Sequence, residues 1–508
     1  MSPIRFLPAA ILVLCLAGPA AGAGDLSPWA GGRDAVEESG LRLPGERVAS
    51  GFSLASAGTG PAGVSPRAFL SLPAARVFAE SAAASVKRPW HAALEVFSVD
   101  FANWAIDRYV LNRSYARVGL ASWAYNLRHG FIFDPDTFGM NFFAHPFSGS
   151  LYFNSARSLG LGFWASTPYA FGGSLLWEMF GETQQPSVND LVMTTTGGIM
   201  LGETLFRLSS LVLDDTDTGW SRAGRETLAF LINPIRGVNR LLFGDAFRRQ
   251  SVNRQLRTSF RGSFGYRGYF VGESTKLSGL TFSPGLEFEF VLGESTPFNP
   301  AKSPFDLVFF DSALRHGRQK LAFSVNSYAL LVGHEVFNVS GQRTLLGLFQ
   351  NFDYISNEIV SVGGSSFALG MDSSYPFGSG FTMRMVGQLG AVVFGASNNK
   401  YTLIEERDYN YGLGPMAKVD FWLSQPRLGR LLLRWGHYQL YTFRATALAG
   451  VDSHDFLTFV SAKYGLTFWG KLGIRFEYVL FKRHLQFEGR PAYDSNLTQL
   501  GAALVIFF

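Results

Sequence analysis

The sequence is nearly free of cysteine, since Cys15 is the only one among 508 residues. It lies within a predicted export signal, in which Arg5 supplies a positive charge and residues 6–16 form an apolar core too short to span a bilayer. A lipoprotein signal at Cys15 is the alternative, but Leu14 stands where a small residue is expected. We therefore predict a signal peptide over residues 1–23. Its removal leaves no thiol, which excludes disulfides, thiolate metal sites and a cysteine nucleophile.

Charge is scarce as well. Asp, Glu, Lys and Arg make up 16% of the chain, whereas soluble proteins carry about 25%. A formal net charge of +5 is small for this length and does not indicate a nucleic-acid partner, and no nucleic-acid module is present. No phosphate-cradling glycine loop follows a predicted strand, so we expect no nucleotide or other cofactor. The high aromatic content, 15% with 48 Phe, instead fits a protein that lies in lipid.

The first half of the chain changes character twice. Residues 24–88 are rich in Ala, Gly, Ser and Pro without a sustained period, and we predict a disordered periplasmic leader there. Residues 89–250 show helical spacing, as in Leu94, Phe97 and Phe101. We therefore predict an α-helical domain over this second segment.

One stretch of the predicted helical domain is almost long enough to cross a membrane. Residues 158–177 carry no charge, but Pro168 and several glycines interrupt them. A strongly apolar export segment would also risk arrest in the inner membrane. We therefore expect helices that pack on, or partly inside, the following domain, as a periplasmic cap or a plug.

From residue 251 to residue 508 the period is two. Lys418 and Asp420 alternate with Val419 and Phe421, and similar alternation recurs along the segment. Such a pattern suits a lumen on one side and lipid on the other, because a charge on the lipid face at mid-depth costs about 2–4 kcal/mol. A soluble β-sandwich also alternates, but its strands are shorter.

The carboxyl-terminal strand supports the membrane interpretation. Phe508, Ile506, Leu504 and Leu500 share one face, which resembles the terminal signal of outer-membrane barrels. We therefore predict an α+β membrane protein in the bacterial outer membrane, with an antiparallel transmembrane β-barrel of about twelve strands after the helical domain. The expected partners are outer-membrane lipids and the barrel-assembly machinery, which would bind the strand that ends at Phe508. A periplasmic ligand or polymer is a further candidate partner.

The densest polar residues lie in the predicted helical domain. They include His145-Pro146, Tyr152, Ala156-Arg157, Trp177-Glu178, Pro186-Ser187 with Asn189-Asp190, and Gly202-Glu203. In these elements the chain resembles a family of bacterial outer-membrane proteins catalogued as domain of unknown function 3943, over roughly residues 90–210. The resemblance implies no known activity, substrate or cofactor, so the residues must be interpreted from their own chemistry.

The spacing of the charged residues makes specific predictions. Glu178 and Glu182 are four apart and are expected to share a helix face. Glu203 and Arg207 have the same spacing, in the orientation that favours an ion pair.

The segment between these two pairs predicts how a helix begins and packs. Ser187 or Asn189 is the expected N-cap. Gly197 and Gly198 permit a neighbouring element to approach closely. We expect one buried polar network built from His145, Arg157, Glu178, Glu182, Asp190 and Arg207.

This network has a structural and a chemical interpretation. Structurally, charges on apolar helices pair with each other and fix the packing. Chemically, His145 could act as acid or base beside a carboxylate while Arg157 binds a phosphate or carboxylate. A metal site at His145, Glu178 and Glu182 is a thin ligand set, and we predict none. Ser148 and Ser155 lie near His145, but no nucleophile elbow surrounds them.

A run of arginines follows the polar segment: Arg222, Arg225, Arg236, Arg240, Arg248, Arg249, Arg254 and Arg257. It predicts either a solvated face beside the membrane or contact with anionic head groups or a periplasmic polymer.

Three functions are compatible with the sequence, and we favour the first. The first is a non-enzymatic barrel, either a channel or transporter or an envelope scaffold. The second is an envelope enzyme, a hydrolase or transferase of lipid or a periplasmic substrate, that uses His145 and its carboxylates. A barrel that anchors a binding module is a third variant.

Overall fold

The computed structural model describes residues 87–248 and 258–507, apart from gaps at 272–280, 293–302, 317–320, 340, 358–359, 379, 402–406, 445–450 and 470–471. The predicted signal peptide, almost all of the predicted leader, Phe508 and three of the arginines lie outside the described residues.

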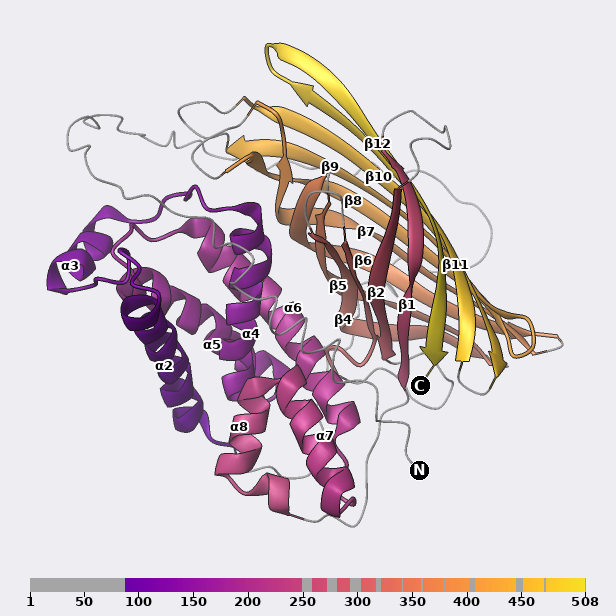
Figure 1. Cartoon of the computed structure of the whole chain (residues 1–508), viewed down its shortest axis with the longest axis horizontal. Helices are drawn as coiled ribbons and strands as arrows, with labels where there is room; N and C mark the ends of the chain where they lie inside the picture. Colours follow the sequence, from indigo (N-terminus) through magenta and orange to yellow (C-terminus); the bar gives the residue numbers. More distant parts are fainter. Residues whose placement is uncertain are drawn as a thin grey trace, which may run out of the picture. The chain divides into compact units, whose positions relative to one another are not determined.

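Helices form the first described part, residues 89–247, which we call the helical domain (Figure 1). They are α2 (Pro89–Ala105), η4 (Ile106–Val110), α3 (Leu120–His129), η5 (Met140–Ala144), α4 (His145–Arg157), α5 (Phe163–Leu176), η6 (Trp177–Gly181), α6 (Val188–Val212), α7 (Gly219–Ile232), α8 (Pro234–Leu242) and η7 (Asp245–Phe247). Among the described residues, no helix is both long enough and apolar enough to cross a membrane.

Antiparallel strands form the second part, which we call the barrel. They are β1 (Thr258–Val271), β2 (Thr281–Leu292), β3 (Val308–His316), β4 (Leu321–Val339), β5 (Gln342–Ser356), β6 (Ser361–Phe377), β7 (Phe381–Asn398), β8 (Tyr409–Gln425), β9 (Gly429–Arg444), β10 (Ser453–Trp469), β11 (Leu472–Phe487) and β12 (Arg490–Phe507). Each strand pairs with its neighbours in sequence, and β1 pairs with β12, so the described strands close into a barrel of twelve. The predicted fold class is confirmed.

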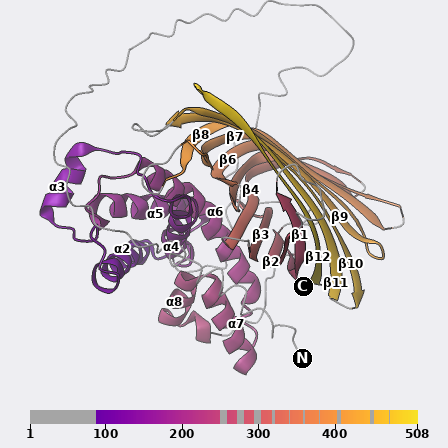
Figure 2. The ribbon, with the colours of Figure 1, turned by 45° about the horizontal axis from the view of Figure 1, so that its top comes forward.

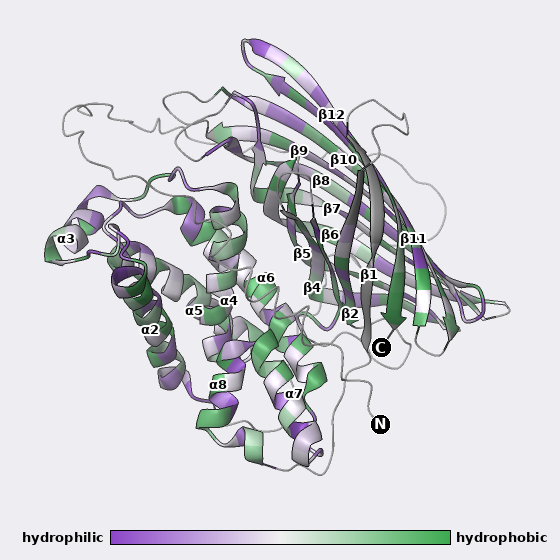
Figure 3. Ribbon diagram, in the orientation of Figure 1, coloured by the Kyte–Doolittle hydropathy of each residue, from purple (hydrophilic) through white to green (hydrophobic). Residues whose placement is uncertain are grey.

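The two faces of the barrel wall differ as the alternation predicts. On β6 and β7 the outward side chains of Leu369 and Leu389 are 72% and 70% exposed, while Asp372 and Arg384 of the same strands pair with each other on the lumen side at 2.9 Å. Figure 3 shows the resulting mixture of hydrophobic and hydrophilic segments along the strands. A wall that exposes leucine and encloses charge is the surface of an outer-membrane β-barrel.

The helical domain packs against outward-facing side chains of this wall. Gln350 on β5 donates a hydrogen bond to the carbonyl of Thr196 at 2.9 Å, and the Thr196 hydroxyl donates to Ser365 on β6 at 3.0 Å. Gln350 alternates with Asn351, whose side chain accepts a hydrogen bond from Lys418 on β8 across the lumen. Figures 1 and 2 show α6 beside these strands. Of the two expected placements, packing on the barrel and packing partly inside it, these contacts agree with the first, because they lie on the outside of the wall.

Within the helical domain, α4 and α6 cross at glycines. A Cβ atom on Gly149 would lie 1.7 Å from the carbonyl oxygen of Thr194, and one on Gly198 would lie 2.5 Å from the backbone of Gly149. The close approach predicted for Gly197 and Gly198 is thus present, and it brings the polar residues of the two helices together.

Candidate functional site

The candidate residues do not form the single network that we expected. They form two clusters along α6. We call the first the carboxylate cluster; it contains Asp134, Asn141, His145, Glu178, Asn189 and Asp190. We call the second the ion-pair cluster; it contains Arg157, Glu203 and Arg207. The prediction placed both in one site because sequence spacing does not reveal that the length of α6 separates them.

The carboxylate cluster is built around the first turn of α6. Ser187 is the N-cap, since its hydroxyl accepts a hydrogen bond from the backbone N–H of Asp190. His145 Nε2 lies 3.2 Å from Asp190 Oδ1, and Nδ1 lies 3.3 Å from the hydroxyl of Thr194. Asn189 donates to Asp134 at 3.0 Å and to Asp190 at 2.9 Å. One side-chain amide therefore joins two carboxyl groups, and the imidazole contacts one of these two and a hydroxyl.

Glu178 and Glu182 differ in their position relative to the helix η6. Glu178 is 1% exposed and its carboxylate accepts a hydrogen bond from the backbone N–H of Ser187 at 2.7 Å. Glu182 follows η6 in extended backbone, with φ −139° and ψ 163°. The prediction that both share a helix face is wrong, because η6 is a π-helix that ends before Glu182.

The carboxylate cluster is fastened to the barrel. Asn141 donates to the hydroxyls of Tyr409 and Tyr411 at 2.6 and 3.1 Å. Arg407 donates to the carbonyl of Asp134 at 3.1 Å. Sequence analysis missed Asp134 and these three barrel residues. The sequence signal that could have indicated this contact is a pair of tyrosines two residues apart on the outward face of β8, where most side chains are aliphatic.

Asp134 and Asp190 share one negative charge. Burial, reinforced by repulsion from Asp134, raises the pKa of Asp190 far above its usual range. Burial also acts to raise the pKa of Asp134, but hydrogen bonds from Asp190, Ser187 and Asn189 and the nearby His145 outweigh it and hold that pKa below its usual value. At neutral pH the pair therefore consists of a charged Asp134 and a protonated Asp190.

The remaining titratable groups of the cluster are neutral or nearly so. Burial raises the pKa of Glu178 to about 8, with repulsion from Asp134 and Asp136 adding to it, although the Ser187 N–H lowers it. Burial lowers the pKa of His145 to about 4, despite the attraction of Asp134. A neutral His145 therefore lies beside a protonated Asp190. Thr194, the hydroxyl nearest to His145, is also only 3% exposed.

The ion-pair cluster joins α4, α6 and the barrel. Glu203 is fully buried between Arg157 and Arg207, whose Nε atoms lie 2.8 and 2.7 Å from its carboxylate. Burial acts to raise the pKa of Glu203, but the two guanidinium groups hold it below its usual value. Arg207 also contacts Asp306, just before β3, at 3.1 Å. The predicted ion pair of Glu203 and Arg207 is present, and no binding face of the carboxylate remains open.

The other candidate residues bond to groups within the protein. Ser155 donates to the carbonyl of Leu151. In the arginine run, Arg225 contacts Asp217 at 2.9 Å and Arg240 contacts Glu226 at 2.7 Å, both within the helical domain. Within the part of the chain that the structure describes, no group of three or more His, Cys, Asp or Glu is placed to hold a metal ion.

Comparison with solved structures gives weak likenesses to outer-membrane barrels. An outer-membrane channel from Pseudomonas putida F1 is 8% identical, with 50% of this chain and 97% of that chain covered and a TM-score of 0.27. Omp33 of Acinetobacter baumannii is 9% identical, with 50% and 98% covered and a TM-score of 0.19. The translocator domain of the autotransporter NalP from Neisseria meningitidis is 12% identical, with 53% and 94% covered and a TM-score of 0.21. At such TM-scores none of them carries an argument about this chain.

No curated protein matches the sequence. One family model does, over residues 130–235, which contain both clusters; it begins and ends further along the chain than the resemblance over residues 90–210 suggested. The helical domain thus carries the segment described as Domain of unknown function (DUF3943).

Proposed function

We propose that the protein is a closed outer-membrane scaffold, whose barrel holds the helical domain against its wall and does not conduct in its resting state. The observation that carries the proposal is a layer of ion pairs across the lumen. Lys463 on β10 bonds to Glu287 on β2 and lies 2.6 Å from Asp311 on β3. These strands are not neighbours of β10, so the lysine bridges the barrel.

A second cation reinforces the same layer. Arg434 on β9 contacts Asp311 at 3.2 Å and Asp420 on β8 at 3.0 Å. Buried opposite charges that neutralise one another are costly to separate, because each would be left without its partner. A passing ion would have to break these contacts.

The scaffold role is supported by what the outer wall carries. Tyr409, Tyr411, Gln350 and Ser365 point away from the lumen and contact the helical domain. A barrel that only formed a pore would present lipid-facing side chains at these positions. The wall is therefore specialised to bind a particular partner, the helical domain of the same chain.

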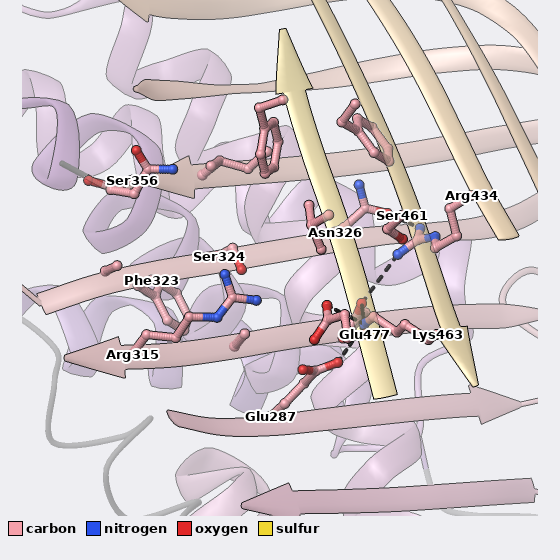
Figure 4. Close-up of a pocket in the computed structure, with 18 residues that line it drawn as sticks. Glu287, Arg315, Phe323, Ser324, Asn326, Ser356, Arg434, Ser461, Lys463 and Glu477 are labelled. Carbon is pink, nitrogen blue, oxygen red and sulfur yellow. Dashed lines mark hydrogen bonds and ion pairs between the residues drawn. The ribbon is translucent and has the colours of Figure 1, made fainter. Parts of the chain in front are cut away.

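A narrow channel is the second candidate, and one observation favours it. A cavity of about 80 Å³ lies in the lumen against the ion-pair layer, and Glu287, Lys463 and Glu477 border it (Figure 4). Arg315 and Asn326 also line it. Movement of the layer would connect this cavity with the rest of the lumen.

Conductance in planar bilayers separates the two functions. The full chain should give no steady current, and Lys463→Ala combined with Arg434→Ala should give one, because the layer loses both bridging cations. Lys482→Ala is the matched control, since that exposed lysine lies on β11 outside the layer. A steady current through the unaltered protein would overturn the closed scaffold in favour of the channel.

The enzyme alternative rests on His145 and finds less support. His145→Ala should leave the barrel assembled if the residue is catalytic, whereas loss of insertion would favour a structural role for the carboxylate cluster. Heat-dependent mobility on a detergent gel reports the assembled barrel in this comparison.

A further inference from the structure

The helix α2 has its polarity reversed. It buries Ala92, Val96 and Asp100, one of them charged. Its exposed face carries four large apolar residues with a regular helical spacing: Trp90, Leu94, Phe97 and Phe101. Trp90 is 85% exposed and Leu94 is 64% exposed. A helix that faces water shows the opposite arrangement, with charge outside and apolar side chains inside.

The neighbouring helix α5 repeats the reversal. It buries Ser166, Gly173 and Ser174 along with Phe163 and Ala170, while Trp164 and Phe171 are each 47% exposed. The two helices are in contact, and the Tyr169 hydroxyl of α5 donates to the carbonyl of Pro89, where α2 begins. Small and hydroxyl residues between helices, with bulky apolar residues outside, are typical of helices that pack within lipid.

The two acidic residues of α2 bond to groups inside the helical domain. Asp100 of α2 accepts a hydrogen bond from Tyr152 of α4. Glu95, also on α2, accepts one from Asn239 of α8 at 2.8 Å. Ionisable groups that face the interior of a helical bundle and bond to polar side chains there are typical of lipid-exposed helices.

The wall of the barrel indicates what covers the apolar face. Leu369 and Leu389 are outward-facing and exposed, as lipid-facing side chains are, whereas Ser365 and Phe394 further along the same two strands are outward-facing but buried. Phe133 and Phe142 of the helical domain stack against Phe394. The helical domain thus takes the place of lipid along part of the wall.

We propose that the outer face of α2 and α5 contacts the acyl chains of the outer membrane beside the barrel. The inference rests on the position of the barrel in the membrane and is independent of whether the lumen conducts. Lipid is the occupant because the helical domain that carries this face is itself docked on a wall that meets lipid, and because the aromatic and aliphatic side chains of the face include no charge. A second copy of the chain is the alternative occupant.

Spin labels in proteoliposomes test the proposal directly. Cys15→Ser removes the native thiol, and single cysteines are then introduced as Phe97→Cys on α2, Phe171→Cys on α5 and Leu389→Cys on the barrel. Arg248→Cys reports an exposed charged position and Val96→Cys a buried one. Collisions with oxygen, which concentrates in lipid, are compared with collisions with a water-soluble nickel chelate.

The expected result is that labels at positions 97 and 171 resemble the label at 389, with ready access to oxygen and at least fivefold less access to the chelate than at 248. Chelate access equal to that at position 248 would overturn the proposal and place the face in water. Low access to both reagents, as at position 96, together with dipolar broadening between labels, would instead identify a second copy. Two labelled helices keep the test decisive if one variant does not assemble.

Discussion

The barrel and the helical domain both enclose their charges, but they do so by different means. In the barrel the strand alternates strictly, so a charged residue such as Lys463 enters the lumen because its neighbours face outward. In the helical domain, the face of each helix that packs inward determines which side chains are enclosed. On α2 the inward face carries Asp100. The period of the sequence pattern distinguishes a helix from a strand. The polarity of the exposed face indicates whether water or lipid surrounds that element. The type of an element and its surroundings are therefore encoded by different features of the sequence.

The largest expected effect comes from removing the acid at the centre of the ion-pair cluster. Glu203→Leu leaves Arg157 and Arg207 buried beside each other, and breaking a buried pair in this way costs about 3–5 kcal/mol. We expect the free energy of unfolding in detergent to fall by that amount, measured by loss of helical circular dichroism on heating.

Two variants sharpen this comparison. Glu203→Gln keeps an acceptor for one arginine and should be destabilised less. Asp372→Leu removes a lumen acid that holds only one guanidinium, that of Arg384, and should also cost less. Equal losses for Glu203→Leu and Asp372→Leu would show that the helical domain does not depend more strongly on its internal charges than the barrel does.

A somewhat smaller effect is expected at the crossing of α4 and α6. Gly149→Ala places a methyl group 1.7 Å from the carbonyl oxygen of Thr194. The helices must separate, at about 3 kcal/mol, the upper end of common overpacking costs. The melting temperature of the helical domain should fall while the heat-dependent gel mobility of the barrel persists.

Gly172→Ala is the matched control, because a Cβ at this α5 position has no atom within 4 Å. It should leave the melting temperature unchanged or slightly raised, since alanine favours a helix over glycine. A melting temperature for Gly149→Ala equal to that of the control would contradict the close crossing.

The smallest expected effect, when it is counted over a single pH unit, is a change in pH dependence. The pKa of Glu178 is raised from 4.5 to about 8 by burial. Below pH 4.5 the folded and unfolded chains both hold this proton. As the pH rises towards 8, only the unfolded chain releases it, so the free energy of unfolding declines. Glu178→Gln removes the titrating group, so the free energy of unfolding should decline less with pH. The difference from wild type is at most about 1.4 kcal/mol over the first pH unit.

Denaturant titrations of wild type and Glu178→Gln between pH 5 and 8 measure this difference. The pKa of His145 is lowered to about 4, so this residue has the opposite effect on the pH dependence. As the pH falls from the usual pKa of histidine towards 4, only the unfolded chain takes up the proton, and the free energy of unfolding declines. His145→Gln should therefore alter the acidic side only. Parallel pH profiles for Glu178→Gln and wild type would argue against a protonated Glu178.

Much of the fold follows from local patterns. Strict alternation around Lys418 and Asp420 predicts strands with a charged and an apolar face, and the closed barrel confirms it. The N-cap at Ser187 and the ion pair of Glu203 with Arg207 also follow from spacing, since both involve residues within one helical turn.

The rest depends on contacts between distant parts of the chain. Asn141 meets Tyr409 and Tyr411, which lie 268 and 270 residues further on, and no local pattern encodes such a pairing. The choice between packing on the barrel and packing partly inside it stayed open for the same reason. The exposed Phe97 and Phe101 were visible as a stripe, but a stripe alone does not say whether it faces a core or the surroundings.

The polar side chains on the outer wall have a consequence for how the protein is made. Gln350 and Ser365 would meet hydrocarbon if strands β5 and β6 entered the membrane alone, and neither could satisfy its hydrogen bonds there. Insertion of the strands and docking of α6 are thereby coupled. We therefore expect a barrel without the helical domain to insert less readily than the full chain.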